Sequence, residues 1–159
     1  MERILGIDPG SRITGYGVVE SDAGVLRFVA CGVIKTTTAA SFAHRLHDIF
    51  SGINQVIQVH SPVVAGVEDV FVGNNSRSAL KLGQARGAAV VAAMDNGLLV
   101  HDYSPRAIKL GVAGYGQATK DQVQHMVRVL LGLSASPSSD AADALAVAIC
   151  HANQLKVAL

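Results

Sequence analysis

The chain has 159 residues, of which 50% are hydrophobic and 16% are charged, so it is long enough for one domain with a sizeable core and too apolar to be intrinsically disordered. Thirteen Lys and Arg residues against twelve Asp and Glu residues give a formal charge of +1, so the overall charge indicates no particular partner. Segment 71–130 is more basic, with seven Lys or Arg residues against three Asp residues, which weakly indicates an anionic partner.

No targeting or membrane segment is predicted. The first twelve residues, MERILGIDPGSR, place acids and a Pro-Gly break inside what would be the apolar part of a signal peptide, and no stretch approaches the roughly 20 apolar residues of a membrane span. Cys31 and Cys150 fit neither a disulfide framework nor a zinc knuckle, and we expect both to be inert core thiols. These features predict a soluble cytoplasmic protein without a membrane partner.

The first third of the chain predicts three short strands, at residues 4–7, 14–19 and 25–34. Turn-forming residues separate them, Asp8-Pro9-Gly10 and Ser21-Asp22-Ala23-Gly24, and such short links favour an antiparallel meander. Apolar residues then take a helical spacing from 42 to 57, with Ser41 as the expected N-cap and residues 60–62 as the end of that helix.

Strands and helices alternate in the rest of the chain. The apolar run 63–67 predicts a buried parallel strand, and residues 98–101 predict a fifth strand. Helices are expected at 78–94, at 105–110 before a glycine-rich loop at 111–116, from a capping box at Thr119 to about 131, and at 140–153. Helix 78–94 is apolar almost all round, so it should pack on more than one side, and Gly83 and Gly87 would let the backbone of a partner subunit approach. The predicted fold class is α/β, in a single domain over residues 1–159.

Two acidic residues follow predicted strands directly. Asp8 follows strand 4–7 and Glu68 follows strand 63–67, at the carboxyl ends where α/β sheets place their chemistry. Asp8 could instead be an Asx-turn residue, which the following Pro-Gly makes credible. Glu68 is harder to explain structurally, because glutamate is a poor strand former and an unpaired buried carboxylate is costly.

Asp140 and Asp143 lie three residues apart on the last helix, so they share a face. Acids are also common in a first helical turn without any function, because they interact favourably with the helix dipole. Together with the two strand-end acids they could form one cluster, which would repel itself unless it held cations such as Mg²⁺ or Mn²⁺. Two such ions activate a water and stabilise the leaving oxygen in an attack at phosphorus. The acids therefore predict a phosphodiesterase or nuclease site.

Two other features are less specific. Gly10, Gly15 and Gly17 superficially resemble a dinucleotide-binding loop, but a predicted hairpin rather than a helix follows them. Phe71 leads into a loop with no obvious core to fill, where it could stack on a base or pack onto its own domain.

Four blocks of sequence carry a resemblance to a known family: ILGIDPGSRITGYG at 4–17, EDVF at 68–71, SALKLGQARG at 78–87 and DAADALA at 140–146. In this order, and over nearly the whole chain, they closely resemble the bacterial RuvC Holliday-junction resolvases. The resemblance implies a ribonuclease H-like fold, with a five-stranded mixed sheet between helices, and a homodimer that nicks symmetric strands of a four-way DNA junction. It also implies dependence on Mg²⁺, with two ions per subunit that Mn²⁺ can replace, and cooperation with the RuvA and RuvB branch-migration proteins.

The resemblance also implies roles for individual residues. The acidic quartet of the family falls on the four acids that the spacing selects, Asp8, Glu68, Asp140 and Asp143. The family's lysines beside the scissile phosphate map to Lys109 and Lys120, although either could be an ordinary solvated side chain, and the junction-stacking aromatic maps to Phe71. Arg77 and Lys81 are further expected DNA contacts. The loop after Phe71 carries its charge at Arg77, where some relatives have a lysine nearer the phenylalanine, and the longer basic tail of some members is not seen.

Two other functions stay open at this point. Actin-like ATPases and sugar kinases also open with a strand, an Asp and a Gly-rich hairpin, but they need two domains and usually far more than 159 residues. A junction-binding dimer that has lost catalysis is the non-enzymatic alternative, and the intact acidic quartet argues against it.

Overall fold

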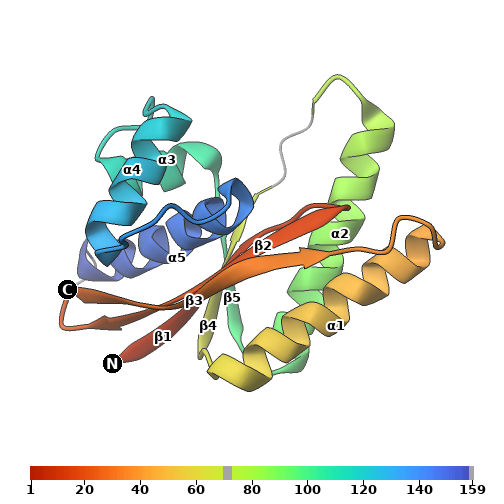
Figure 1. Cartoon of the computed structure of the whole chain (residues 1–159), viewed down its shortest axis with the longest axis horizontal. Helices are drawn as coiled ribbons and strands as arrows, with labels where there is room; N and C mark the ends of the chain where they lie inside the picture. The colour runs from red at the N-terminus through yellow and green to blue at the C-terminus, as the bar shows by residue number, and fades with distance from the viewer. Residues whose placement is uncertain (70–72, 158–159) are drawn as a thin grey trace.

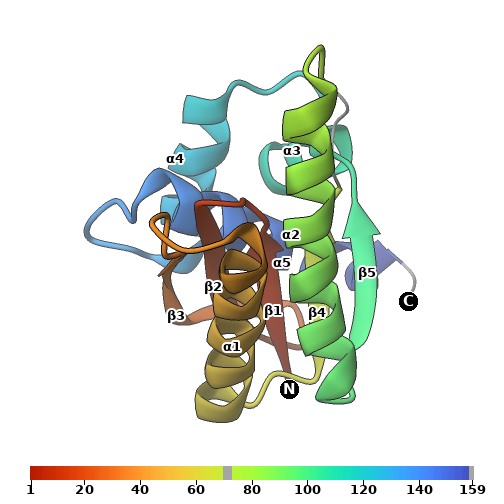
Figure 2. The ribbon, with the colours of Figure 1, turned by 90° about the vertical axis from the view of Figure 1, so that its right-hand side faces the viewer.

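The computed structural model, which describes residues 1–69 and 73–157, has a five-stranded sheet with helices on both faces (Figures 1 and 2). The strand order is β3-β2-β1-β4-β5, with antiparallel pairing along β3-β2-β1 and parallel pairing along β1-β4-β5. This is the mixed sheet that the sequence predicts. The elements in chain order are β1 (Glu2–Asp8), β2 (Ile13–Asp22), β3 (Val25–Lys35), α1 (Phe42–His60), β4 (Val64–Glu68), α2 (Ser76–Asp95), β5 (Leu99–Tyr103), α3 (Pro105–Ala113), α4 (Lys120–Leu131) and α5 (Ser139–Val157).

Alternate residues of the central strands build two cores, one on each face of the sheet. Ile4 and Val64 pack on the face that α5 covers together with α3 and α4, whereas Leu5 and Ala65 pack on the face that α1 and α2 cover. This alternation follows from the two-residue period of a strand. Because both faces are covered, the central strands have no solvated side and are apolar on both, as the sequence of 63–67 predicts.

The predicted turns and caps are confirmed. Ala23 and Gly24 join β2 to β3 with positive φ angles of 47° and 86°, the geometry of a tight hairpin turn. The Ser41 side chain accepts a hydrogen bond from the backbone N–H of His44 at the start of α1. Thr119 and Gln122 form the expected capping box of α4.

Helices α2 and α3 differ from their predictions. α3 continues to Ala113 instead of ending at residue 110, because Gly114, with φ of 90°, provides the left-handed residue that ends it. α2 starts two residues early, at Ser76, because Asn75 caps it. Within the described residues α2 packs on one side only, and an added Cβ at Gly83 or Gly87 would meet nothing within 4 Å. The second packing side of α2, for which the sequence suggests a partner subunit, therefore stays a prediction.

The backbone of α5 lies directly on β1 and β2. A Cβ added at Gly6 would lie 2.0 Å from the carbonyl oxygen of Ala144, and one added at Gly15 would lie 2.0 Å from that of Asp140. Only glycine leaves room for this contact. α5 is itself rich in alanine, so its small side chains allow the same close approach along its length. The position of α5 over the sheet is thus fixed by glycines of β1 and β2.

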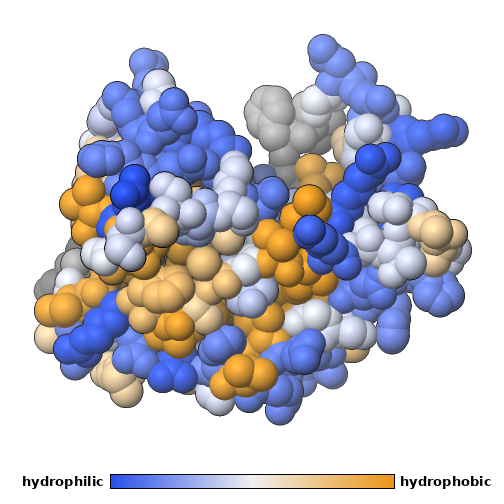
Figure 3. All heavy atoms as spheres, viewed as in Figure 1, coloured by the Kyte–Doolittle hydropathy of each residue, from blue (hydrophilic) through white to orange (hydrophobic). Residues whose placement is uncertain are grey.

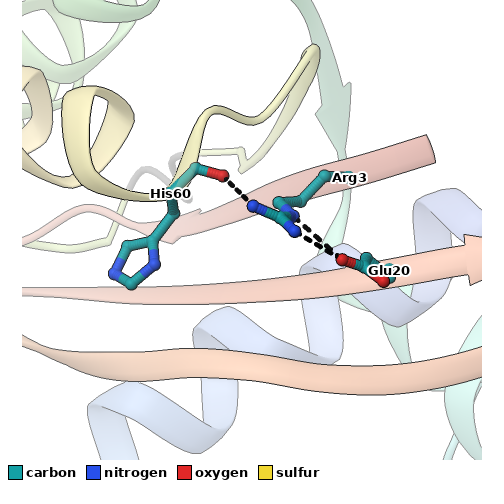
Figure 4. A network of polar contacts seen from close by, with 3 residues as sticks. All are labelled: Arg3, Glu20 and His60. Atoms are coloured by element: carbon teal, nitrogen blue, oxygen red, sulfur yellow. Dashed lines mark hydrogen bonds and ion pairs between the residues drawn. The ribbon is translucent and has the colours of Figure 1, made fainter.

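Arg3 connects neighbouring elements at the end of the sheet opposite to Asp8. Its guanidinium donates to Glu20 Oε2 on β2, at 2.6 and 3.1 Å, and to the carbonyl oxygen of His60 at the end of α1, at 2.6 Å (Figure 4). A cation at a helix C-terminus also interacts favourably with the helix dipole. Arg3 therefore anchors α1 to the first two strands.

Two further expectations concern cysteines and membranes. Both cysteines are free; Cys150 is buried, and Cys31 is half-buried. Among the helices of the described ranges, none has the length and apolarity that crossing a bilayer requires.

The contact between α5 and the glycines predicts a graded response to alanine. Gly6→Ala and Gly15→Ala place Cβ against helix backbone that cannot move alone, so each should lower the free energy of unfolding by about 3 kcal/mol. Gly66→Ala is the matched control, because its Cβ would meet the Val147 side chain at 3.1 Å and should cost clearly less. Urea unfolding measures all three, and a Gly15→Ala variant as stable as the wild type would contradict this account of the packing.

Candidate active site

The first two acids meet because β1 and β4 are parallel neighbours. Ile7 pairs with Val67 in the register of the two strands, so the next residues, Asp8 and Glu68, lie side by side at the carboxyl edge of the sheet. Asp8 and Glu68 share a side-chain hydrogen bond. A bond between two carboxyl groups requires a proton on one of them.

The other two acids come from the first turns of α5. Gly15 pairs with Asp8 in the register of β1 and β2, and the carbonyl oxygen of Asp140 lies over Gly15. The contact at Gly15 therefore places the start of α5 beside Asp8. The charges of Asp140 and Asp143 both act on Asp8, so all four predicted acids lie in one cluster.

Two lysines face this cluster from α3 and α4. Lys120 Nζ forms an ion pair with Asp143 Oδ2 at 3.2 Å, and the charge of Lys109 acts on Glu68. Both lysines line a cavity of about 320 Å³ that also reaches Glu68 and Asp143. The cavity is open to solvent, and the apolar part of its lining comes from Pro105, Ile108, Val123 and Ala146.

Burial and mutual repulsion raise the pKa values of Asp8, Glu68 and Asp143. Burial raises the pKa of Asp8 to about 8, and the charges of Glu68, Asp143 and Asp140 add to this effect. Burial also raises the pKa values of Glu68 and Asp143, although Lys120 opposes the effect at both carboxyls. In turn, the hydrogen bond to Asp143 raises the pKa of Lys120, which stays positively charged. The protein thus concentrates more negative charge here than it neutralises.

The Asx-turn alternative for Asp8 is not what the structure shows. The backbone N–H of Gly10, which an Asx turn at Asp8 would engage, donates instead to Thr14 Oγ1 at 3.2 Å, and Thr14 Oγ1 donates to the Gly10 carbonyl at 2.9 Å. Thr14 is fully buried. The turn after Asp8 is therefore held by Thr14, which leaves the Asp8 carboxyl to the cluster.

The donor set of the cluster fits a hard divalent cation. Carboxylate oxygens are the ligands that Mg²⁺ and Mn²⁺ prefer, and a cation would remove the repulsion that raises the pKa of Asp8. In the described part of the chain, no three His, Cys, Asp or Glu side chains are already arranged to coordinate an ion. Asp8 and Glu68 bond to each other and Asp143 bonds to Lys120, so ion binding would exchange these bonds for metal–oxygen bonds.

The remaining predicted residues lie elsewhere. Arg77 and Lys81 are exposed on the N-terminal half of α2, outside the cavity, and Phe71 lies outside the described residues. The sequence reasoning missed Gln124, whose side chain lowers the pKa of Asp143 and donates from Nε2 to Ser139 Oγ at 3.2 Å. Gln124 lies one turn after Lys120 on the same helix, a spacing that could have indicated a shared target.

Comparisons with known proteins agree with this geometry. Residues 4–151 match the family described as crossover junction endodeoxyribonuclease RuvC. The chain is 54% identical to RuvC of Acinetobacter baumannii over 96% of its own length and 84% of that protein. It is 53% identical to RuvC of Geobacter sulfurreducens, with 95% and 92% of the two chains covered.

Solved structures show the same fold. RuvC of Thermus thermophilus in complex with a Holliday junction substrate matches with a TM-score of 0.93 at 36% identity, over 99% of this chain and 97% of that one. The yeast mitochondrial Holliday junction resolvase matches with a TM-score of 0.71 at 13% identity, a likeness of fold alone. The predicted ribonuclease H-like fold is confirmed.

The raised pKa of Asp8 predicts a stability cost in the absence of metal. Its folded-state value, about 8, lies above the ordinary 3.8, so the native state binds more protons than the unfolded state between these values and loses stability as the pH rises. Asp8→Asn removes this loss. In EDTA at pH 8 the variant should be more stable by at least about 1 kcal/mol, the value of one pKa unit, and the difference should shrink toward pH 4. If the free energies of unfolding of the wild type and Asp8→Asn, measured with urea, differ by the same amount from pH 4 to pH 8, the pKa of Asp8 is not raised.

Proposed function

The chain belongs to the RuvC family of crossover junction endodeoxyribonucleases, the Holliday-junction resolvases of recombination and repair, and we propose that its chemistry takes place at the carboxylate cluster. The observation that carries this assignment is the meeting of Asp8, Glu68, Asp140 and Asp143 at one sheet edge, beside an open cavity with Lys109 and Lys120 in its wall. The substrate is a four-way DNA junction, like the Holliday junction bound by the Thermus thermophilus relative.

The four acids are the metal ligands in this proposal. They would hold two Mg²⁺ ions per subunit, for which Mn²⁺ can substitute, because only oxygen donors are present and their charges repel one another. Bound there, the ions supply an activated water and stabilise the leaving oxygen at phosphorus. The protein's own part is to place the four carboxylates rigidly, two on strand ends and two on a helix fixed by glycine contacts.

Lys109 and Lys120 act on the phosphate itself. Lys120 is oriented by its ion pair with Asp143, and both ammonium groups line the cavity next to the acids. A positive charge in this position stabilises negative charge that grows on the phosphate oxygens in the transition state.

Junction contacts lie outside the cavity. Arg77 and Lys81 project from α2 into solvent and are assigned to the DNA backbone, which dominates the affinity of such proteins. Phe71 is assigned to stacking on a base at the crossover, on the resemblance alone. Residues 1–159 act as one catalytic domain, in the cytoplasm and with RuvA and RuvB as partners.

A homodimer would place two such sites on one junction. The outward face of α2 carries three exposed apolar side chains, Leu80, Val91 and Met94, together with Gly83 and Gly87, whose surroundings are empty. These five residues recur at helical spacing, so they form one stripe. A small-residue stripe of this kind lets a second helix approach closely, and we assign it to the α2 of a second copy.

The carboxylate assignment predicts a separation of cleavage from binding. Asp8→Asn, Glu68→Gln, Asp140→Asn and Asp143→Asn should each lower the single-turnover cleavage rate of a four-way junction by at least about a thousandfold, or about 4 kcal/mol. Junction affinity should stay the same or rise, because each change removes a negative charge beside DNA. Asp95→Asn, an exposed acid at the end of α2, is the control. If a variant of one of these four acids cleaves at the wild-type rate, that acid does not belong to the proposed site.

The dimer assignment predicts different effects for two equally exposed valines. Val91 on α2 and Val129 on α4 are both 57% exposed. Val91→Asp should convert a dimer of about twice 16.5 kDa into a monomer, because a buried unpaired charge is costly at an interface, whereas Val129→Asp should stay dimeric. Light scattering at micromolar concentration measures both. A wild-type monomer that cuts both strands in one binding event would contradict the assignment.

A further inference from the structure

Two cations from different helices lie beside the same aromatic ring. The guanidinium carbon of Arg45 on α1 is 5.7 Å from the centroid of the Phe42 ring, and Lys81 Nζ on α2 is 5.9 Å from it. Both distances are within the range of a cation–π interaction. Phe42 is the first residue of α1, so the three side chains, which we call the Phe42 patch, join the starts of α1 and α2.

The Phe42 patch lacks a negative counterpart. Within residues 1–69 and 73–157, neither Arg45 nor Lys81 takes part in an ion pair. The Nε atom of Arg45 is shielded from solvent and has no hydrogen-bond partner. Two cations held at one ring repel each other, and a shielded donor without a partner costs free energy. An anion bound between the two cations would relieve their repulsion.

The patch lies at the same end of the sheet as the acids. β3 ends at Lys35, which pairs with Ile13 just after the turn that follows Asp8, and Thr36 donates its backbone N–H to the Arg12 carbonyl at 3.0 Å. The segment 36–41 therefore leads into α1 from this end. α2 also starts here, since it follows the end of β4. Figure 3 shows hydrophilic prominences over α3 and α4 and over the upper part of α2.

We infer that the Phe42 patch is a second phosphate-binding site, which holds the sugar–phosphate backbone of a junction arm on the side of the acids opposite to Lys109 and Lys120. The inference rests on the proposed function and extends it to Arg45 and Phe42. A DNA backbone supplies an anion every few ångströms, so two cations from neighbouring helices can contact successive phosphates of one strand. The Phe42 ring positions both cations and reduces the conformational freedom that they lose on binding.

The test is the salt dependence of junction binding in EDTA, where no cleavage occurs. Arg45→Gln and Lys81→Gln should each reduce the slope of log Kd against log salt by about 0.9 for each phosphate that is no longer neutralised, and together weaken binding about tenfold at low salt. Arg27→Gln is the control, because it removes the same charge from an exposed position near the start of β3, at the opposite end of the strands. It should leave the affinity and the slope near the wild-type values. Phe42→Leu should weaken binding about twofold to threefold.

The outcomes separate this inference from the proposed function. If the wild-type protein does not bind or cleave the four-way junction, the proposed function fails. If the wild type binds and Lys81→Gln, a change at an exposed position that folding tolerates, leaves the slope unchanged, the Phe42 patch does not contact phosphate. An equal slope change in Arg27→Gln would also overturn the inference, because net charge alone would then explain the effect. If Phe42→Leu binds the junction with unchanged affinity, the Phe42 ring plays no part in binding.

Discussion

The catalytic arrangement depends on one packing contact, that of the α5 backbone with Gly6 and Gly15. No larger residue fits at these positions, because an added Cβ would overlap the carbonyl oxygens of Ala144 and Asp140. Asp8 lies directly across from Gly15 in the antiparallel register, so the first turn of α5 is held against the first strand end. Packed interiors have little freedom to adjust, so the backbone that carries the carboxylates is held in place. The fold thus brings the four acids together independently of any ion.

This rigidity has an electrostatic cost. The structure that brings the acids together also buries them, and burial with mutual repulsion raises the pKa of Asp8 to about 8. Lys120 neutralises only one neighbour, Asp143, so the cluster keeps an excess of negative charge. Such strain at a functional site is offset elsewhere in the molecule, here by the two apolar cores on either side of the sheet. In the proposed function, a cation that binds the cluster would recover this free energy, so the same residues would disfavour the metal-free state and favour the loaded one.

Strand and helix positions and the acidic quartet could be predicted from the sequence, since periodicity, turn residues and strand-end acids are local signals. Contacts between distant segments could not. In the sequence Gly15 lies in a predicted strand and in an apparent dinucleotide-binding loop, and nothing there shows that it admits Asp140. No local pattern shows which helix will cover which glycine. Gln124 looks like an ordinary helix-surface residue in sequence, and its partner Ser139 lies on another helix. Nothing in the sequence shows either that Lys81 of α2 lies beside the Phe42 ring of α1.

The basic residues assigned to DNA fall into two kinds that differ in their partners. Lys120 has an acidic partner within the protein and lies at the cavity beside the acids, where the proposed function needs a cation to stabilise the transition state. Arg45 and Lys81 lie against the Phe42 ring and keep their charges available to an incoming anion. A carboxylate partner fixes where a cation lies, whereas a cation without one is free to pair with a phosphate. In the proposed function, the paired Lys120 therefore serves the chemical step, and the unpaired Arg45 and Lys81 would hold the junction.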